Sequence, residues 1–427
     1  MPHQFESILK RIRPTEEEKK QNEKIARKLI NEINKEGYEA ILVGSRARNT
    51  FVSGDRDLDI FVFFAKNTPR KELERQGLAL GKHILKKHKP LVHYAEHPYV
   101  KGKIEKMDVE IVPCYKVKKE IISSVDRTPL HNDYLIKRIK RKEDEVILLK
   151  KFLSVIDAYG ADQRVHGFSG VLCEVLVLHY GSFLKVVKEV AKWEKKTVID
   201  LAKLCKKEEY AKFPEPLVAI DPVDKNRNMA AAVSRTTLSR FILACRNFNE
   251  KNPEKAFFPA PRKINIKEKI KGKNLLIVLF GKPDVIEEVL WSQLERFASA
   301  IKNQFIINGF QVYRTMHWTD EKKRCAIVFE LDSYTVSEFE KHKGPEIWDT
   351  ENVQKFIEKN PDNWISRSRI FAWKKRKYTD SIGLIKELLN SEIVPSHLTK
   401  VVKKNKLIKG KAVKKQKNIM RECFKWG

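Results

Sequence analysis

The sequence predicts an α+β protein of several domains, and three observations support this fold class. Strand and helix patterns are mixed over roughly the first 140 residues, a mainly helical pattern follows, and strands return after a proline-rich stretch. The chain has 427 residues, which is long enough for about two to four domains that each bury a core. Its apolar fraction of 42% indicates a globular protein and excludes a disordered or fibrous one.

The first predicted domain, residues 1–137, alternates strands with helices. Its strands are expected at 39–44, 57–64 and 107–114. Its helices are expected at 15–36, 45–51 and 69–88. Gly44 should end the first strand and Pro113 the third, and Ser45 can cap the helix that opens at SRARNTF. These elements predict a compact α/β domain.

A helical central domain is predicted over residues 138–255. Its helices are expected at 141–160, 167–190 and 236–249, the second as one deeply buried helix. The stretch AIDPVDKNRNMAAAVS, rich in Asp and Asn, predicts a loop before the third helix. Three prolines in NPEKAFFPAPRK predict a linker to the next domain.

The C-terminal domain, residues 256–427, is predicted to mix strands and helices. NLLIVLF, WSQLERFASAIKNQF, FQVYRTMHW and RCAIVFEL follow the order strand, helix, strand, strand, which is half of a ferredoxin-like unit. RIFAWKKRKY, residues 369–378, interleaves aromatic with cationic residues, as suits stacking on RNA and contact with its backbone. The lysine-rich run from Lys400 to Lys417 is expected to be a solvated helix or a flexible arm, and direct contact with RNA is an open alternative.

Charge and cysteine usage narrow the class of partner. The chain carries 86 Lys and Arg against 56 Asp and Glu, a formal net charge of +30, which favours a polyanion such as nucleic acid. No apolar run approaches the roughly 20 residues of a membrane span, and the N-terminal stretch lacks the apolar core of a signal peptide. The six cysteines are scattered without CxxC spacing, which argues against zinc. We therefore expect a cytoplasmic protein that binds nucleic acid and no membrane.

Two aspartates in the strand DLDIFVFF indicate chemistry. Asp57 and Asp59 project from one face of the strand, about 7 Å apart, where they could share metal ions. Bare carboxylates are costly to bury, and Mg²⁺ binds carboxylates together with substrate phosphates. An isolated pair of aspartates of this kind is more often a solvated strand end. The neighbouring segments therefore decide whether Asp57 and Asp59 form a metal site.

Two neighbouring segments favour catalysis. Gly44 and Ser45, between a strand and a helix, allow close backbone approach to a phosphate, and Arg48 adds a positive charge. On the strand MDVEIVPC, Glu110 shares a face with Asp108 and offers a third carboxylate. Three such groups predict a two-metal site for phosphoryl transfer, in which one metal activates the attacking hydroxyl and the other stabilises the leaving oxygen.

Eight blocks together resemble the archaeal-type (class I) CCA-adding enzymes of the polymerase-beta-type nucleotidyltransferase superfamily. They are GSRARNTF, YAEHPYV, VEIVPCYKV, VDRTPLH, LLKKFL, YGA, GFSGVLCEVL and DPVDKNRNMAA. The resemblance covers residues 38–250 and continues more weakly to about 378. It implies a nucleotidyltransferase head, a helical central domain for nucleotide recognition, and a C-terminal tRNA-binding body and tail. It also implies addition of C, C and A to the tRNA 3′ end from CTP and ATP without a nucleic-acid template.

By this resemblance, Asp57, Asp59 and Glu110 hold two Mg²⁺ ions while the tRNA 3′-hydroxyl attacks the α-phosphate and pyrophosphate leaves. The family usually places Asp where this chain has Glu110. Asp108, on the same face, is the alternative ligand, and the register of Glu110 to the VPC block favours Glu110.

The resemblance also assigns the nucleotide contacts. The residues expected to bind the triphosphate are Ser45, Arg48, His131, Lys150 and Tyr159. Arg227 is expected to help read the incoming base, with Tyr94 and Ala95 near that pocket. Each of these residues taken alone has a structural explanation, and only their shared order with the family favours the functional one.

Two other functions stay open. A poly(A) polymerase or oligoadenylate synthase-like enzyme would use the same carboxylates with ATP alone, and an RNA-binding protein could carry an inactive catalytic domain. By resemblance, the C-terminal part would grip the acceptor and T arm of tRNA. A homodimer is one option for the assembly of the protein.

Overall fold

The computed structural model describes residues 3–93, 97–118, 120–260 and 264–425. The chain folds into two compact units, residues 1–260 and residues 261–427, called the first and second unit below. Both units combine helices with sheets, so the predicted α+β class with several domains is confirmed. The predicted domain boundaries after residues 137 and 255 stay predictions.

The first unit contains a five-stranded sheet in the order β1-β2-β5-β4-β3. Its strands are β1 (Glu39–Leu42), β2 (Asp57–Phe64), β3 (Leu91–His93), β4 (Tyr99–Ile104) and β5 (Met107–Tyr115). The central pair β2 and β5 is parallel, and the other pairs are antiparallel. The parallel pair brings the two carboxylate-bearing segments of the sequence side by side.

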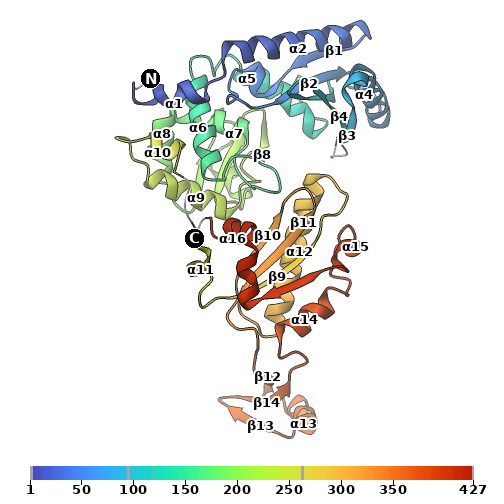
Figure 1. Ribbon diagram of the computed structural model, residues 1–427, viewed down its shortest axis with the longest axis vertical. Helices are drawn as coiled ribbons and strands as arrows, with labels where there is room; N and C mark the ends of the chain where they lie inside the picture. The colour runs from blue at the N-terminus through green and yellow to red at the C-terminus, as the bar shows by residue number, and fades with distance from the viewer. Residues whose placement is uncertain (1–2, 94–96, 119, 261–263, 426–427) are drawn as a thin grey trace. The chain divides into compact units, whose positions relative to one another are not determined.

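Two helices, α2 (Glu16–Lys35) and α4 (Arg70–Ile84), cover one face of this sheet (Figure 1). Because side chains alternate along a strand, Leu58, Ile60 and Val62 of β2 point into the core beneath these helices. Phe61, two residues beyond Asp59, packs in a separate cluster on the opposite face. The aspartates of β2 therefore project from the face that α2 and α4 leave uncovered.

Pro113 does not end its strand, as the sequence had suggested, because β5 continues to Tyr115. The pairing of β4 with β5 reaches only as far as Ile111, so the missing N–H of Pro113 costs no bond to β4. Beyond that point β5 pairs with β2 alone, and Pro113 lies opposite Val62.

The rest of the first unit is mainly helical. Its helices are α1 (Glu6–Ile12), α5 (Arg127–Leu135), α6 (Glu143–Val155), α7 (Gly170–Tyr180), α8 (Phe183–Val190), α9 (Arg235–Arg246) and α10 (Glu254–Phe257). Short 3₁₀ helices are η1 (His3–Phe5), η2 (Lys86–His88), η3 (Ser124–Asp126) and η4 (Lys207–Lys212). The core contains edge-to-face contacts of Phe5, Phe152 and Phe183. Phe257 of the predicted linker is buried in this core as well.

The single long helix expected over 167–190 is wrong. The chain breaks at Gly181, whose φ of +97° suits glycine, and α7 and α8 meet at an angle of 89°. Among the described residues no single helix has the length and apolarity to cross a membrane, and this bent pair passes that test only jointly. Both helices contribute buried residues to the core of the first unit.

The loop expected over 219–234 is also partly wrong. Its first half forms a hairpin of β7 (Leu217–Asp221) and β8 (Asp224–Asn228), and β7 pairs in parallel with β6 (Thr197–Ile199). Polar residues on β8 concealed this strand from hydrophobic patterning, since only Asn228 of β8 is buried.

The second unit has a four-stranded sheet in the order β10-β11-β9-β15. Its elements are β9 (Asn274–Gly281), α12 (Glu287–Ile307), β10 (Val312–Thr319), β11 (Arg324–Leu331), α14 (Ser381–Leu388) and β15 (Lys406–Lys409). The order of strands and helices is that of a complete ferredoxin-like unit, of which the sequence had indicated half. The short helices α11 (Ile266–Lys269), α15 (Thr399–Val402) and α16 (Lys417–Cys423) accompany this sheet.

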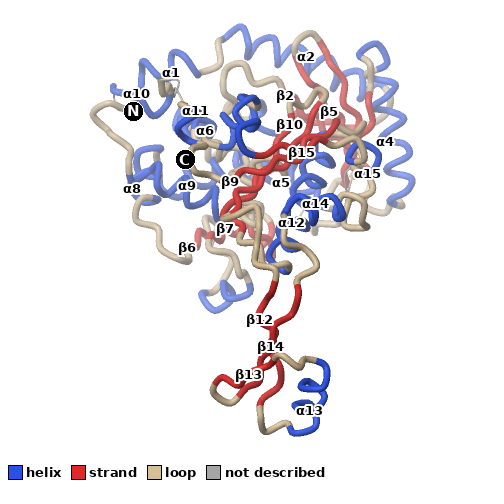
Figure 2. The backbone as a smooth tube through the Cα atoms, turned by 60° about the horizontal axis from the view of Figure 1, so that its bottom comes forward, coloured by secondary structure: helices blue, strands red, loops and turns tan. Residues whose placement is uncertain are grey.

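An inserted lobe separates β11 from α14. It consists of β12 (Phe339–Glu346), α13 (Thr350–Lys359), β13 (Asn363–Ser366) and β14 (Arg369–Lys375), and the strand order is β12-β14-β13. Figures 1 and 2 show the lobe projecting away from the four-stranded sheet. One face of the small sheet packs against α13 through Val353, Phe356, Ile370 and Ala372.

The lysine-rich end is neither a solvated helix nor a flexible arm. Strand β15 pairs antiparallel with β9, and the 3₁₀ helix η5 (Gly410–Lys415) and α16 follow. Ile408, Val413 and Met420 are buried in the core on one side of the sheet. The lysines mask an apolar periodicity that fixes this segment in the fold.

Candidate active site

The carboxylate cluster consists of Asp57, Asp59, Asp108 and Glu110 at one end of the β2–β5 pair. In the parallel register Asp57 lies opposite Asp108, and Asp59 lies opposite Glu110. Paired residues of neighbouring strands project from the same face, so all four carboxylates share one face of the sheet. The structure thus brings the three predicted metal ligands together and places Asp108 beside them.

Gly44 allows the backbone to approach this cluster. The backbone N–H of Val43 donates to the carbonyl of Asp59 at 3.0 Å, and a Cβ atom at position 44 would lie 2.6 Å from Asp59 Oδ2. The φ of Gly44 is +75°, which a residue with a side chain rarely adopts. A glycine is therefore required here by both space and conformation.

Ser45 lies within the short helix α3 (Gly44–Ala47) and not at its cap. The N-cap residue is Val43, which makes no side-chain cap bond, so the capping role expected for Ser45 is wrong. Its backbone carbonyl accepts the N–H of Thr50 at 2.9 Å. The Ser45 side chain is partly exposed and follows Gly44 directly, next to the carboxylate cluster.

Sequence reasoning missed Arg46, which supports the loop before β2. Its buried guanidinium donates to the carbonyls of Asp55 and Asp57 and stacks on the ring of Phe51 at 4.4 Å. Burial, only partly offset by the nearby aspartates, lowers the pKa of Arg46. The GSRAR segment contains two arginines, and their spacing alone could not tell which one approaches the carboxylates.

Like charge and partial burial act together in the carboxylate cluster. Burial and then the charges of Glu110 and Asp57 raise the pKa of Asp59 to about 7. Burial and then the charge of Asp55 raise the pKa of Asp57. A cation between these groups would offset both the burial and the repulsion that raise the two pKa values.

Lys101 of β4 supplies one positive charge to the cluster. It lies opposite Glu110 in the β4–β5 register, and its Nζ is 3.1 Å from Glu110 Oε1. Within the described ranges, no three Asp, Glu, His or Cys side chains already converge on one metal position. The carboxylate oxygens and their excess negative charge nevertheless match what a hard divalent cation binds.

A second group, called the compensated cluster, consists of Arg48, Thr50, Lys150 and Glu174. Glu174 is fully buried on α7 and accepts from Arg48 Nε at 2.9 Å and from Thr50 Oγ1 at 2.5 Å. Lys150 of α6 is also buried and donates to the carbonyl of Thr50 at 2.8 Å. Here each buried charge has a partner, and the lone glutamate in an apolar helix was the sequence signal for it.

Tyr159 lies beside Lys150 of the compensated cluster. A Cβ atom at Gly170 would lie 3.3 Å from both the Tyr159 hydroxyl and Lys150 Nζ, so these two groups meet at the start of α7. Burial first, and then nearby groups that include Asp55 and Asp57, raise the pKa of Tyr159 well above its ordinary value. The predicted phosphate ligands Lys150 and Tyr159 thus lie together at the start of α7.

His131 and Arg227 meet at a residue that sequence reasoning missed. His131 Nε2 on α5 lies 2.7 Å from Asp221 Oδ1, and Arg227 Nη1 on β8 donates to Asp221 Oδ2 at 2.8 Å. Burial alone would raise the pKa of Asp221, but His131, Val223 N–H and Arg227 outweigh it and the pKa is lowered. The remaining predicted residues, Tyr94 and Ala95, lie outside the described residues.

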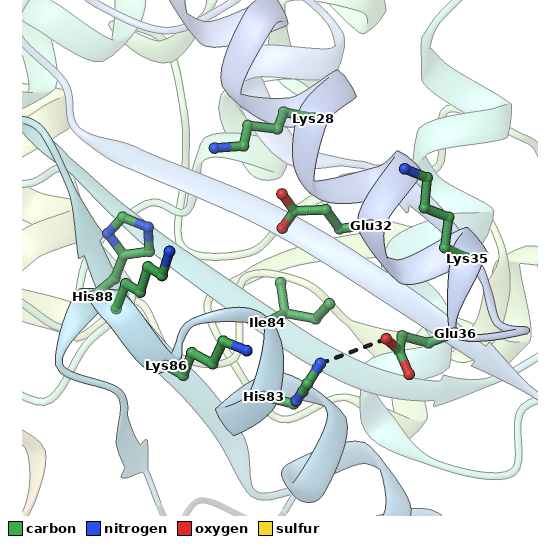
Figure 3. Close-up of a pocket in the computed structure, with 9 residues that line it drawn as sticks. Lys28, Glu32, Lys35, Glu36, His83, Ile84, Lys86 and His88 are labelled. Atoms are coloured by element: carbon green, nitrogen blue, oxygen red, sulfur yellow. Dashed lines mark ion pairs between the residues drawn. The ribbon is translucent and has the colours of Figure 1, made fainter.

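The pocket in Figure 3 is distinct from these clusters. It has a volume of about 290 Å³ between α2 and the end of α4, and it contains an ion pair of His83 with Glu36 at 3.5 Å. Its lining residues are Lys28, Glu32, Lys35, Glu36, His83, Ile84, Lys86, Lys87 and His88. No residue predicted for catalysis or nucleotide binding is among them.

In the second unit, the aromatic face consists of Lys341, Trp364, Phe371 and Trp373 on β12–β14. Lys341 Nζ lies 3.8 Å from the centre of the Phe371 ring, and the rings of Trp364 and Trp373 are 4.9 Å apart. Trp373 is 50% exposed. The segment RIFAWKKRKY therefore presents aromatic rings beside cations, on the face opposite α13.

Comparison with known proteins extends over nearly the whole chain. Residues 23–142 match a nucleotidyltransferase domain, residues 144–259 the second domain of tRNA nucleotidyltransferase, and residues 271–410 the C-terminal domain of CCA-adding enzyme. Among solved structures, the Cid1 poly(U) polymerase covers 60% of this chain at 14% identity and a TM-score of 0.49, too weak a likeness for any conclusion.

Three archaeal proteins named CCA-adding enzyme are similar to the full chain. The protein of Methanoregula boonei is 38% identical over 90% of this chain and 86% of its own length. The protein of Archaeoglobus fulgidus is 38% identical, covering 88% and 86%, and that of Methanocaldococcus jannaschii is 34% identical over 98% of both chains. The chain therefore belongs to the family of CCA-adding enzymes, as its sequence motifs had predicted.

Proposed function

We propose that this chain adds C, C and A to the 3′ end of tRNA from CTP and ATP without a nucleic-acid template. As a member of its family, it is a nucleotidyltransferase that uses a divalent metal ion, nucleoside triphosphates and tRNA. The observation that carries the proposal is the agreement of all three parts of the chain with CCA-adding enzymes, in order and over nearly full length.

Asp57, Asp59 and Glu110 are the proposed ligands of two Mg²⁺ ions. Their register on β2 and β5 places three carboxylates on one face, and Gly44 leaves room beside Asp59. When bound, the ions would lower the pKa of the tRNA 3′-hydroxyl and offset the charge of the departing pyrophosphate. The protein then contributes mainly by holding the 3′-oxygen and the α-phosphate in line.

The proposed triphosphate ligands differ in burial. Ser45 is partly exposed beside Gly44, where its hydroxyl and the neighbouring backbone can reach a phosphate. Arg48 and Lys150 are buried and hydrogen bonded to Glu174 and to the carbonyl of Thr50, and we propose them as triphosphate ligands on the strength of the family resemblance. His131 and Tyr159 complete this set, and Arg227 is proposed to read the base.

The aromatic face is the proposed RNA contact of the second unit. Exposed rings beside lysines suit stacking on unpaired bases together with contact to the phosphate backbone. The net charge of +30 supports a substrate rich in phosphate. Contact with the acceptor and T arm of tRNA remains a proposal, as does a homodimer. The cytoplasm is the proposed compartment, since all six cysteines are free thiols.

The first experiment measures incorporation of labelled CTP and ATP into tRNA that lacks its 3′ CCA. We expect the wild type to add C, C and then A when Mg²⁺ is present, and Asp59→Ala to add none. Tailing with ATP alone would instead indicate a poly(A) polymerase-like enzyme. No incorporation by the wild type would leave an RNA-binding protein and contradict the proposal.

A second experiment tests the aromatic face through tRNA affinity. Trp373→Ala should weaken binding by about 1–3 kcal/mol, the usual contribution of one stacked base. Trp348→Ala is the matched control, because Trp348 is 77% exposed but precedes α13 and lies outside the aromatic face. Equal losses for both variants in a salt-controlled binding titration would exclude this face as the RNA contact.

A further inference from the structure

The hairpin of β7 and β8 is tied to helix α5 by an ion pair and by a hydrogen bond. At the tip of the hairpin, Asp224 accepts from Arg127 at 2.9 Å. Deeper in, Asp221 bridges His131 on α5 and Arg227 on β8 at 2.7 and 2.8 Å. The hairpin is therefore fixed against the helix that presents His131.

Asp221 differs from Asp224 in burial and in the number of its bonds. Its carboxylate is completely buried, and Oδ1 also accepts the N–H of Val223 at 3.0 Å. A buried carboxylate is tolerated only when its partners are held in good geometry, so burial constrains both His131 and Arg227. The strand register shifts between Ile220 and Asp221, and such a bulge turns side chains away from their regular direction.

The two partners of Asp221 are proposed to contact opposite ends of the bound nucleotide. His131 is a proposed triphosphate ligand, whereas Arg227 is proposed to read the base. The Arg227 side chain is 42% exposed, so part of its guanidinium remains available beyond Asp221. One carboxylate thus fixes the distance between a phosphate contact and a base contact.

We infer that Asp221 is a positioning residue for nucleotide selection, which holds Arg227 in register with His131 so that cytosine and adenine are chosen over uracil and guanine. This inference rests on the proposed function. Guanidinium groups recognise planar acceptors through a fixed fork of donors, so a small change in the orientation of Arg227 changes which base it fits. Asp221 itself touches no substrate in this proposal.

The test compares Asp221→Asn with Asp224→Asn, which breaks the other ion pair of the same hairpin. For both variants, kcat/KM is measured for CTP and UTP on tRNA lacking CCA, and for ATP and GTP on tRNA ending in CC. We expect Asp221→Asn to lower the correct-to-incorrect ratio about tenfold or more, the usual effect of a lost charge-assisted bond. Asp224→Asn should keep the wild-type ratio.

The outcomes separate this inference from the proposed function. Equal loss of kcat/KM for correct and incorrect nucleotides in Asp221→Asn would reduce Asp221 to a structural role and overturn the inference alone. Failure of the wild type to add C, C and A would overturn the proposed function and the inference together.

Circular dichroism would show whether Asp221→Asn folds, and a second set of variants serves if it does not. Arg227→Gln and His131→Asn each remove one partner and leave the Asp221 carboxylate. We expect the double variant to lose no more selectivity than the worse single variant, because one bridge is broken in each case. Additive losses would show that the two side chains act independently and would contradict the inference.

Discussion

The carboxylate cluster and the compensated cluster lie in the same unit but differ in how far their charges are paired. In the compensated cluster, Glu174 is buried with Arg48 and Thr50 bonded to it. In the carboxylate cluster, burial first and neighbouring carboxylates second raise the pKa values of Asp57 and Asp59. Uncompensated like charge is costly to keep in a folded protein and indicates a site for a cation, whereas the paired charges of the compensated cluster also stabilise the fold.

The largest expected effect is that of Asp59→Asn. Removal of a proposed metal ligand should lower nucleotide addition by about a thousandfold or more. A carboxyl whose pKa rises from 3.8 to about 7 on folding binds more protons when folded, so it lowers stability as pH rises through that window. The metal-free variant should therefore melt at a higher temperature than the wild type near neutral pH, with the difference vanishing towards pH 4. A lower melting temperature at neutral pH would show that Asp59 is compensated after all.

Glu174→Gln should lower the stability of the protein, whereas Asp59→Asn should raise it. Glu174→Gln leaves the buried guanidinium of Arg48 without a full counter-charge, which typically costs about 3–5 kcal/mol of unfolding free energy. Urea denaturation measures this loss. Glu250→Gln is the control, since its ion pair with Lys188 is exposed and should contribute less than about 1 kcal/mol. Similar values for the two variants would contradict the distinction between the clusters.

Variants of Glu110 and Asp108 test which of these two residues is the third metal ligand of the carboxylate cluster. Glu110 lies opposite Asp59, and Asp108 opposite Asp57 near the start of both strands. We expect Glu110→Ala to reduce nucleotide addition about a hundredfold or more and Asp108→Ala to keep most of it. The reverse result would move the third metal ligand to Asp108.

The smallest expected effect is that of Lys101→Met. This variant removes the only positive partner found for Glu110 among the described residues. The extra negative charge should then tighten Mg²⁺ binding by roughly 1 kcal/mol. Calorimetric titration with Mg²⁺ checks this, and Lys106→Met, in the turn between β4 and β5, controls for net charge. Unchanged affinity would show that Lys101 does not compete with the metal for Glu110.

Sequence patterns predicted the elements of the carboxylate cluster because strand alternation is local. The bounds of β2 agree with the prediction residue for residue. The register of β2 with β5 places Glu110 beside Asp59, as a shared metal site would require. Polar or cationic surface residues explain the failures, since β8 and β15 carry exposed charged side chains that conceal their strands. Pairing partners such as Asp221 are distant in sequence from His131, and no local pattern reports such a contact.

The pairing of β15 with β9 can form only late in translation, because β15 lies near the C-terminal end of the chain. Ile277 finds its partner Ile408 only when almost the whole second unit has been translated, whereas the first unit has all its residues by position 260. Nascent chains can therefore complete the first unit on the ribosome while the apolar edge of β9 still lacks its neighbour. A chain stopped before residue 406 would expose that edge to aggregation, so premature termination there would be harmful even with every catalytic carboxylate already made.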